Sequence, residues 1–366
     1  MTTRKIPIAN PVLDEADIKA VAEVLGSGAL AQGLKVARFE EGFASYIGTR
    51  YAIATSSGTA ALHTTLLAQG IGQGDEVITT PFSFIASANA ILFCQAKPVF
   101  VDIDENTYNI KSGLISEKIT PKTKAIIAVH LYGQPCDMKE IASICHQNNL
   151  VLIEDACQAH GAEYAGKKVG SFGTGCFSFY PTKNMTTGEG GIITTNDESI
   201  ARRARMIRDH GQKERYLHQI LGYNYRMTDI AAAIGICQLK KLDEFNQKRM
   251  ENAAFLSGKI GKIGGLVPPF TMPEAEHVFH QFTIRVTADF GISRDELKAR
   301  LKSKGVSAEV YYPLPIHKQP YYQELGYGNE HLPNSEKAAR EVLSLPVHPS
   351  LTKEELNYIV QTIKDI

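Results

Sequence analysis

The sequence predicts an α/β protein in which a large three-layer α/β/α domain with a mostly parallel sheet precedes a small α+β domain. Between about residues 51 and 195, short apolar runs alternate with helical stretches, the pattern of a parallel sheet covered by helices on both faces. Several of these runs are apolar at almost every position, as strands buried on both faces are. After a glycine- and proline-rich stretch at residues 261–274 the alternation restarts, which indicates a second domain.

The elements of the large domain follow from these runs in order. Strands are expected at residues 51–55, 75–80, 97–103, 124–131, 150–156, 176–180 and 190–195, with helices at 57–70, 86–94 and 136–149 among them. A helix at 198–208 and a single long helix at 228–256 follow. Thr228 is expected to cap the long helix and Asp229 to complement its dipole. This helix is the natural bridge between the two domains.

The C-terminal region predicts a strand at 280–286, a helix at 293–305, a strand at 307–313 and two final helices. We therefore expect a large domain at residues 1–245 and a small α+β domain at residues 246–366.

Composition excludes several classes of function. The 366 residues contain 39 Lys plus Arg and 39 Asp plus Glu, so the chain lacks the bulk positive charge of a nucleic-acid binder. No uncharged apolar run reaches the roughly 20 residues that a membrane helix needs. The cysteines show no CxxC pair and no spacing typical of zinc, so we expect a cytoplasmic protein with neither disulfides nor a metal; they are Cys94, Cys136, Cys145, Cys157, Cys176 and Cys237.

The segment TSSGTAAL at residues 55–62 ends a predicted strand and begins a predicted helix. The first amides of a helix have no partner inside it, and the helix dipole places partial positive charge there, so such an end can bind phosphate. The alternative is that Ser57 or Thr59 only caps the helix.

The segment LVLIEDACQA at residues 150–159 places two carboxylates at the end of a buried strand. Glu154 and Asp155 are expected on opposite faces because side chains alternate along a strand. Ligands of open α/β sheets bind at the carboxyl ends of the strands, and Gln158 is close enough in sequence to reach the same place. A helix cap or a structural ion pair remains the alternative for these acids.

Lys183 follows the apolar strand CFSFY and precedes a glycine-rich turn with Gly188, Gly190 and Gly191. Most lysines are solvated surface residues. At a strand edge, however, a partly buried lysine loses its proton more readily, and the free amine is the form that makes a Schiff base.

The order of these three motifs resembles the pyridoxal phosphate (PLP) enzymes of the aspartate aminotransferase fold, known as fold type I. The wording is most similar to the DegT/DnrJ/StrS family of nucleotide-sugar aminotransferases, from GSGALAQG near the start to YYPLPIH and beyond. The resemblance implies that Lys183 binds PLP covalently and later moves the substrate proton. It implies that Asp155 pairs with the pyridinium nitrogen and that Gln158 binds the ring hydroxyl.

The resemblance also implies contacts to the rest of the cofactor. Gly58, Thr59 and Ser178 match phosphate contacts, and Phe84 matches the aromatic side chain that stacks on the ring, with core packing as its alternative. Asn224 matches a residue that the family sends to the phosphate of the neighbouring subunit, which implies a homodimer with shared active sites.

Five further residues lie in segments that resemble the family's substrate-facing loops, with surface ion pairs or aromatic packing as the alternative; they are His210, Arg226, Tyr311, Tyr312 and His317. The implied partners are an amino donor, usually L-glutamate, and a keto-sugar carried on a nucleotide. The TTGEGG segment at residues 186–191 favours a 4-keto over a 3-keto sugar. Another PLP reaction on an amino acid, such as decarboxylation or desulfuration, and a non-catalytic regulator remain alternatives.

Overall fold

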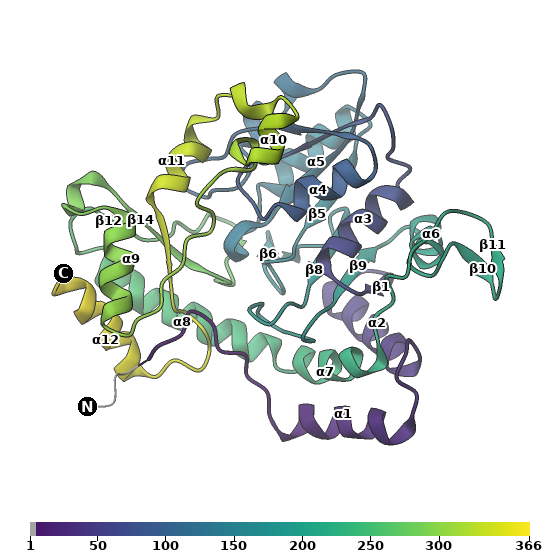
Figure 1. Ribbon diagram of the computed structural model, residues 1–366, viewed down its shortest axis with the longest axis horizontal. Coiled ribbons are helices and arrows are strands. Elements are labelled where there is room, and N and C mark those ends of the chain that lie inside the picture. Colours follow the sequence, from purple (N-terminus) through teal and green to yellow (C-terminus); the bar gives the residue numbers. More distant parts are fainter. Residues whose placement is uncertain (1–4) are drawn as a thin grey trace.

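The computed structural model describes residues 5–366 of the chain (Figure 1). Its α-helices are α1 (Glu15–Ser27), α2 (Leu34–Ile47), α3 (Gly58–Ala68), α4 (Ala86–Phe93), α5 (Met138–Gln147), α6 (Glu198–Arg208), α7 (Asp229–Leu239), α8 (Leu242–Ile260), α9 (Arg294–Ser303), α10 (Pro320–Glu324), α11 (Pro333–Glu341) and α12 (Lys353–Lys364).

The strands are β1 (Tyr51–Thr55), β2 (Glu76–Thr79), β3 (Lys97–Phe100), β4 (Thr123–Val129), β5 (Val151–Asp155), β6 (Glu163–Tyr164), β7 (Lys167–Lys168), β8 (Thr174–Ser178), β9 (Gly191–Thr195), β10 (Gln212–Glu214), β11 (Leu217–His218), β12 (Leu266–Val267), β13 (Ala275–Glu276), β14 (Phe282–Val286) and β15 (Val342–Leu345).

The central sheet has seven strands in the order β1-β9-β8-β5-β4-β2-β3. Strand β9 is antiparallel to its neighbours β1 and β8, whereas β8, β5, β4, β2 and β3 pair in parallel. The carboxyl ends of the parallel strands therefore meet at one edge of the sheet. The predicted α/β class with a mostly parallel sheet is confirmed.

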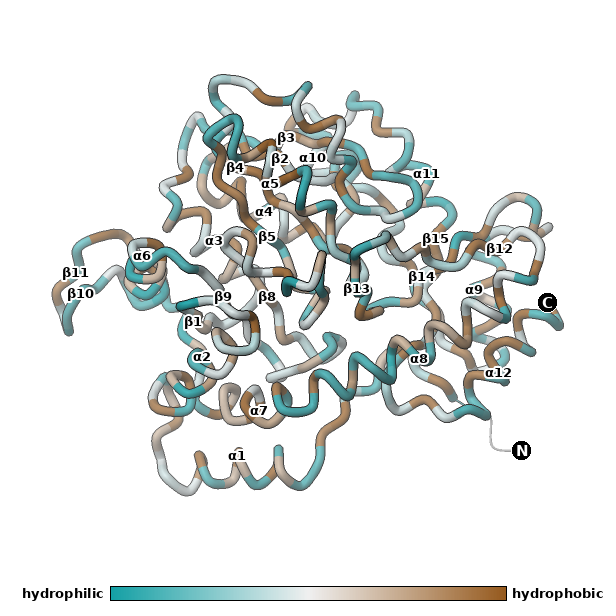
Figure 2. Tube along the Cα trace, turned by 180° about the vertical axis from the view of Figure 1, so that it is seen from behind, coloured by the Kyte–Doolittle hydropathy of each residue, from teal (hydrophilic) through white to brown (hydrophobic). Residues whose placement is uncertain are grey.

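Helices cover both faces of this sheet. Successive side chains of its strands point to opposite faces, and those on both faces are apolar. In β4, Ile127 packs in a core with residues of α3, α4 and α6, whereas its neighbour Ile126 packs on the other face with residues of α5. Figure 2 shows hydrophobic colour along β4. Both isoleucines are fully buried.

The predicted single helix at 228–256 is wrong in one respect, because it is divided into α7 and α8 at Lys240 and Lys241. Neither a glycine nor a proline marks the break. Lys241 instead forms ion pairs with Asp14 at 2.6 Å and Asp17 at 2.7 Å, which hold this point against the start of α1. Tertiary contacts therefore override a continuous helical pattern.

Thr228 caps α7 as predicted, since its hydroxyl accepts a hydrogen bond from the amide of Ala231 at 3.1 Å. Asp229 has a further role. Its buried carboxylate accepts hydrogen bonds from the amides of Gly33, Lys35 and Val36 at 2.8–3.1 Å, where α2 begins. One carboxylate thus stabilises the N-terminal ends of two helices.

The C-terminal sheet has the order β12-β14-β15. The predicted strand at 307–313 is wrong, because that segment forms only an isolated bridge between Glu309 and Ser344 of β15. Its continuation, with Tyr311 and Tyr312, turns toward the carboxyl edge of the main sheet. Three helices, α10, α11 and α12, follow residue 313 instead of the two that were predicted.

A second apolar core lies between this small sheet and α8, α9 and α12, and Ile6 from the N-terminal segment packs in it. We propose that the division between the domains lies in α8, close to the predicted boundary after residue 245. Figure 1 shows α8 running from below the main sheet to the C-terminal helices. All six cysteines are free. Across residues 5–366, every helix is too short or too polar to cross a membrane.

Candidate active site

A cavity of about 670 Å³ opens at the carboxyl edge of the main sheet, where the ends of β5 and β8, the start of α3 and the 311–312 segment meet. Nine of the residues proposed from the sequence line it; they are Gly58, Thr59, Phe84, Asp155, Gln158, Ser178, Lys183, Tyr311 and Tyr312. Residues separated by more than 250 positions in the chain therefore meet in one site.

The N-terminal end of α3 forms one wall of this cavity. Ser57 caps the helix, because its hydroxyl accepts a hydrogen bond from the amide of Ala60 at 3.1 Å. The amides of Gly58 and Thr59 precede that bond at the open end of the helix. A Cβ atom on Gly58 would lie 2.6 Å from Cβ of Ser178, so glycine is needed for the helix end and this serine to approach. Capping and an open anion site therefore coexist here.

Asp155 ends β5 and is 5% exposed. Its Oδ2 atom accepts a hydrogen bond from the hydroxyl of Ser87 at 2.6 Å, and its Oδ1 atom accepts one from the amide of Cys157 at 3.2 Å. Within residues 5–366 no Lys, Arg or His forms an ion pair with it, which argues against a structural ion pair.

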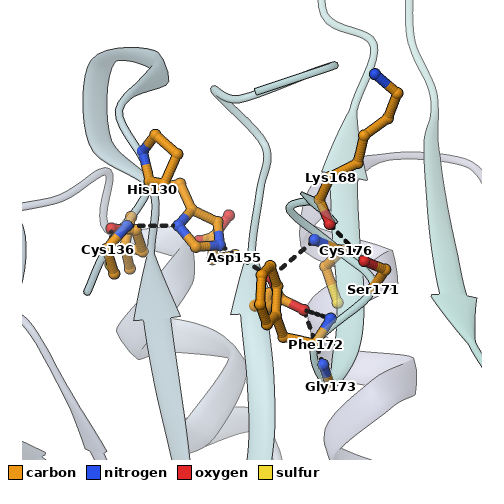
Figure 3. A network of polar contacts seen from close by, with 12 residues as sticks. His130, Cys136, Asp155, Lys168, Ser171, Phe172, Gly173 and Cys176 are labelled. Atoms are coloured by element: carbon orange, nitrogen blue, oxygen red, sulfur yellow. Dashed lines mark hydrogen bonds and ion pairs between the residues drawn. The ribbon is translucent and has the colours of Figure 1, made fainter. Parts of the chain in front are cut away.

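Glu154 lies on the opposite face of β5, as the alternation predicted. Its buried carboxylate accepts hydrogen bonds from the amides of Gly170, Phe172 and Gly173 at 2.7–2.8 Å. Figure 3 shows Phe172 and Gly173 in this network. Glu154 therefore secures the turn before β8, while Asp155 faces the cavity.

His130 is the fourth group at Glu154, with its Nε2 atom 3.2 Å from Oε2 of the carboxylate. Its Nδ1 atom accepts a hydrogen bond from the amide of Cys136 at 3.0 Å (Figure 3). The ring proton therefore lies on Nε2 and is donated to Glu154.

Gln158 is held in one orientation. Its Oε1 atom accepts a hydrogen bond from the amide of Tyr132 at 2.9 Å, so its Nε2 atom is directed to the hydroxyl of Tyr312 at 3.2 Å. The amide group thus presents a hydrogen-bond donor beside Tyr312 at the cavity wall.

Lys183 follows β8, and its amide donates a hydrogen bond to the carbonyl of Tyr180 at 2.9 Å. The side chain is half-buried. Burial lowers the pKa of the Lys183 amine, and the nearby Cys157 and Asp155 oppose this effect in part. The neutral, nucleophilic form of the amine is therefore favoured relative to a lysine in water.

Phe84 is 56% exposed at the cavity, which excludes core packing as its role. Its ring centroid lies 6.2 Å from that of Tyr312, with 39° between the ring planes. The carbonyl of Tyr311 accepts a hydrogen bond from the hydroxyl of Tyr132. Burial raises the pKa of Tyr312, so its hydroxyl stays protonated.

Four of the proposed residues do not line the cavity. His210 and Asn224 are exposed. Arg226 forms an ion pair with Asp209. The backbone of Asp209 also forms an isolated β-bridge with that of Asn224. His317 is fully buried, with Nε2 3.3 Å from Glu336. The geometry of one chain therefore gives no support to a substrate contact by His317.

Sequence reasoning named Ser57 only as a helix cap and missed several other residues of the cavity wall, namely Ser83, Ser87, Cys157, Tyr180, Thr182, Glu189, His280 and Gln281. Cys157, Tyr180, Thr182 and Glu189 adjoin the motifs, and their proximity in sequence could have indicated them. Ser87, His280 and Gln281 come from distant segments, and nothing in their local sequence marks them.

The sequence matches the DegT/DnrJ/EryC1/StrS aminotransferase family over residues 11–364. The chain belongs to this family. A pleiotropic regulatory protein of Geobacillus stearothermophilus is 45% identical, with 95% of this chain and 93% of that protein covered. A GDP-perosamine synthase of Caulobacter vibrioides is 39% identical over 99% of this chain and 98% of its own length.

A solved structure of S. venezuelae DesV in complex with a ketimine intermediate has a TM-score of 0.93 to this chain, with 36% identity and 98% of both chains covered. Family membership and this likeness confirm the expected fold and the expected cofactor, PLP.

The residues of the cavity fit this cofactor. The open end of α3 and the hydroxyl of Ser178 offer donors to a phosphate, in a cradle that a Cβ on Gly58 would fill. Asp155 offers a carboxylate acceptor to a ring nitrogen, Gln158 and Tyr312 offer polar contacts, and Lys183 offers the amine for a covalent bond. Family members with a regulatory name and with an enzymatic name are both similar to this chain, so the site decides between these functions.

Proposed function

We propose that the chain is a PLP-dependent aminotransferase that moves an amino group from an amino acid to a keto-sugar carried on a nucleotide, in amino-sugar biosynthesis. The observation that carries this proposal is the meeting of Lys183, Asp155 and the open end of α3 in one cavity. When bound, PLP supplies an electron sink for the charge that develops when a proton leaves the carbon next to nitrogen.

Asp155 holds a proton at the ring nitrogen. Its two hydrogen bonds, from Ser87 and from the amide of Cys157, fix the orientation of the carboxylate, and a negative charge opposite the nitrogen favours the protonated form of that nitrogen. Gln158 orients the ring through its fixed amide, and Phe84 supplies an aromatic face at the cavity.

Lys183 acts as both nucleophile and proton carrier in this proposal. Because its amine is neutral more often than a lysine in water, it is able to attack a carbonyl and to accept a proton from carbon. Its position beside the cavity also lets it return the proton on the other half of the reaction.

The finer features of the reaction are part of the proposal. We propose L-glutamate as the amino donor, a 4-keto sugar as the acceptor on the basis of residues 186–191, and the cytoplasm as the location. We also propose a homodimer in which Asn224 reaches the neighbouring subunit. Asn224 is exposed and does not line the cavity of its own chain, which supports that arrangement.

A desulfurase would need a nucleophilic cysteine at the cavity, and Cys157 does line it. Burial and the neighbouring Asp155 raise the pKa of this thiol well above its usual value, with Lys183 opposing them. The thiol is therefore protonated and poorly nucleophilic, which supports transamination over desulfuration.

The test is to add L-glutamate to the purified holoenzyme and then each of a panel of 3-keto and 4-keto nucleotide sugars. We expect loss of the visible absorbance of lysine-bound cofactor with release of 2-oxoglutarate, then its return with the correct sugar. A regulator would bind the cofactor without releasing 2-oxoglutarate, and a decarboxylase would release carbon dioxide. Lys183→Ala serves as the negative control, because it removes the covalent bond to the cofactor.

A further inference from the structure

A buried cation without a counterion lies behind the segment that carries Lys183. Arg249 of α8 is 5% exposed, and no ion-pair partner for it occurs in the described part of the chain. Its Nη1 atom donates to the carbonyl oxygens of Phe279 and His280, both at 3.3 Å, while its Nε atom is buried without a partner. An unpaired buried guanidinium nitrogen is costly.

Asn184, the residue after Lys183, has a buried hydrogen-bond acceptor that lacks a donor. Its Nδ2 atom donates to Oδ1 of Asn246 at 2.8 Å and to the carbonyl of Val278 at 3.0 Å. Asn246 in turn donates to the carbonyl of His160 at 2.8 Å, so both amide groups are fixed in orientation. The Oδ1 atom of Asn184 is left buried without a donor.

A cavity of about 10 Å³ is lined by both of these residues, together with Thr182 and Lys183. This volume matches the space that the centre of one water molecule needs. Both unpaired atoms are closed to water as the side chains stand, so a bridging water needs a small shift of these side chains toward the cavity. It would then accept a hydrogen bond from Nε of Arg249 and donate one to Oδ1 of Asn184. One unpaired atom is a donor and the other is an acceptor, and a water can bond both. Internal waters usually satisfy buried polar atoms of this kind.

We propose that Asn246 and Arg249 of α8 are positioning residues for Lys183, acting through Asn184, and that one bound water joins Arg249 to Asn184. This inference rests on the proposed role of Lys183. Asn246 and Arg249 are three positions apart and therefore lie on one face of the helix.

The arrangement connects the lysine to the second core of the protein. Beyond Arg249, α8 continues into that core with Ala253, Leu256 and Ile260 (Figure 1). The lysine is bonded to the cofactor in one stage and free in another, and it must return to the same place. A displacement of even about 1 Å in such a group can lower a rate on the order of a hundredfold.

The first test is a high-resolution crystal structure of the wild-type protein, which needs neither substrate nor activity. We expect a single ordered water within hydrogen-bond distance of both Nε of Arg249 and Oδ1 of Asn184. An empty cavity with both atoms unpaired would overturn the water site. This readout is independent of whether the protein transfers amino groups.

The second test compares Arg249→Gln with Arg249→Met. Glutamine places an amide nitrogen at the position of Nε and keeps a donor for the water, whereas methionine places a methyl group there, and both remove the charge. We expect Arg249→Met to lose the water and about tenfold in kcat with an unchanged KM for the sugar, and Arg249→Gln to stay within about twofold of wild type. Lys248→Met, an exposed neighbour on α8, controls for helix propensity.

In cofactor-free protein, the rate at which an amine-specific reagent labels Lys183 gives a readout that does not depend on catalysis. We expect Arg249→Met to change this rate and Arg249→Gln to preserve it. Equal kcat values and equal labelling rates in the two variants would overturn the positioning role. If Arg249→Met does not fold, the wild-type crystal structure and Arg249→Gln still decide the water site.

Discussion

The hydroxyl of Ser87 lies 2.6 Å from Oδ2 of Asp155. Ser87 belongs to the first turn of α4 and Asp155 ends β5, so the contact joins two elements that are 68 residues apart. Behind it, the hydroxyl of Ser83 lies 3.0 Å from that of Ser87. Two hydroxyl groups in sequence therefore orient the carboxylate at the base of the cavity. Neither serine belongs to β5 or to the motif that contains Asp155.

Ser87→Ala should lower kcat about tenfold, because a hydrogen bond to a charged group contributes about 1.5–3 kcal/mol. The KM for the sugar should change little, since Ser87 acts through Asp155. Steady-state kinetics on the purified variant measure both values. Ser83→Ala is the matched control, because it leaves the Ser87 bond to Asp155 in place and should stay within about twofold. An equal loss in the two variants would contradict this account.

Gly58→Ala should weaken cofactor retention about tenfold while the protein still folds. The added Cβ would lie 2.6 Å from Cβ of Ser178, and relief of such a clash costs about 1–3 kcal/mol. Dialysis followed by absorbance of the remaining cofactor measures retention. Gly258→Ala is the control, because a Cβ there meets no atom within 4 Å. Normal retention in Gly58→Ala would show that the helix end does not hold the phosphate.

Much of the large domain could be predicted because its strands are short, apolar and separated by clear turns. Strand β1 and helix α6 have the predicted bounds, and the other strands of the main sheet differ by a few residues. Periodicity determines these elements locally. The break between α7 and α8 could not be predicted in this way, because it depends on ion pairs from Lys241 to α1.

The residues of the candidate site also fall into two groups, those that local sequence indicates and those that depend on tertiary packing. Asp155, Gln158 and Lys183 stand in motifs whose local sequence indicates chemistry, and all three line the cavity. Ser87 reaches the site only through the packing of α4 against the sheet, which a single sequence does not reveal. The predicted role of Asn224 concerns a second subunit and stays a prediction until the assembly is tested.

Asn224→Ala should weaken cofactor retention if the residue reaches the phosphate of the neighbouring subunit. Mixing this variant with Lys183→Ala should then restore part of the activity, because some hybrid dimers contain one intact site. The measurement is activity after the two variants are unfolded and refolded together, with hybrid formation checked by differently tagged chains. No recovery despite proven hybrids would place the two residues in the same subunit's site.

Asp229→Ala should lower the free energy of unfolding by about 3 kcal/mol. The change leaves the amides of Gly33, Lys35 and Val36 without their acceptor at the start of α2, and unsatisfied buried donors cost about 1–3 kcal/mol each with partial recovery by water. Urea unfolding followed by circular dichroism measures the loss. Asp295→Ala, an exposed acid in the first turn of α9, should cost less than about 1 kcal/mol.

Acid should destabilise the protein through His348. Burial lowers the pKa of His348 from its ordinary value of 6.5 to about 4, so the folded state holds the ring neutral while the unfolded state binds a proton below pH 6.5. The contribution of the neutral ring to the free energy of unfolding is therefore fully present above pH 6.5 and is lost as the pH falls toward 4. About 2 kcal/mol of it is lost by pH 5.

Urea unfolding of the cofactor-free protein at pH 7.5 and pH 5 measures this loss directly. His348→Gln cannot titrate, so its stability should fall by about 2 kcal/mol less than that of the wild type between the two pH values. His331→Gln is the matched control for the substitution itself, because His331 is exposed. The buried ring has only the hydroxyl of Ser350 as a side-chain partner, at 2.9 Å from Nδ1, while its Nε2 atom is buried without one. Burial and the charge of Arg249 disfavour a protonated ring, and the backbone of Pro7 and Glu355 oppose this only in part. Acid should therefore favour opening of the fold around this histidine. An identical pH dependence in His348→Gln and wild type would refute that mechanism.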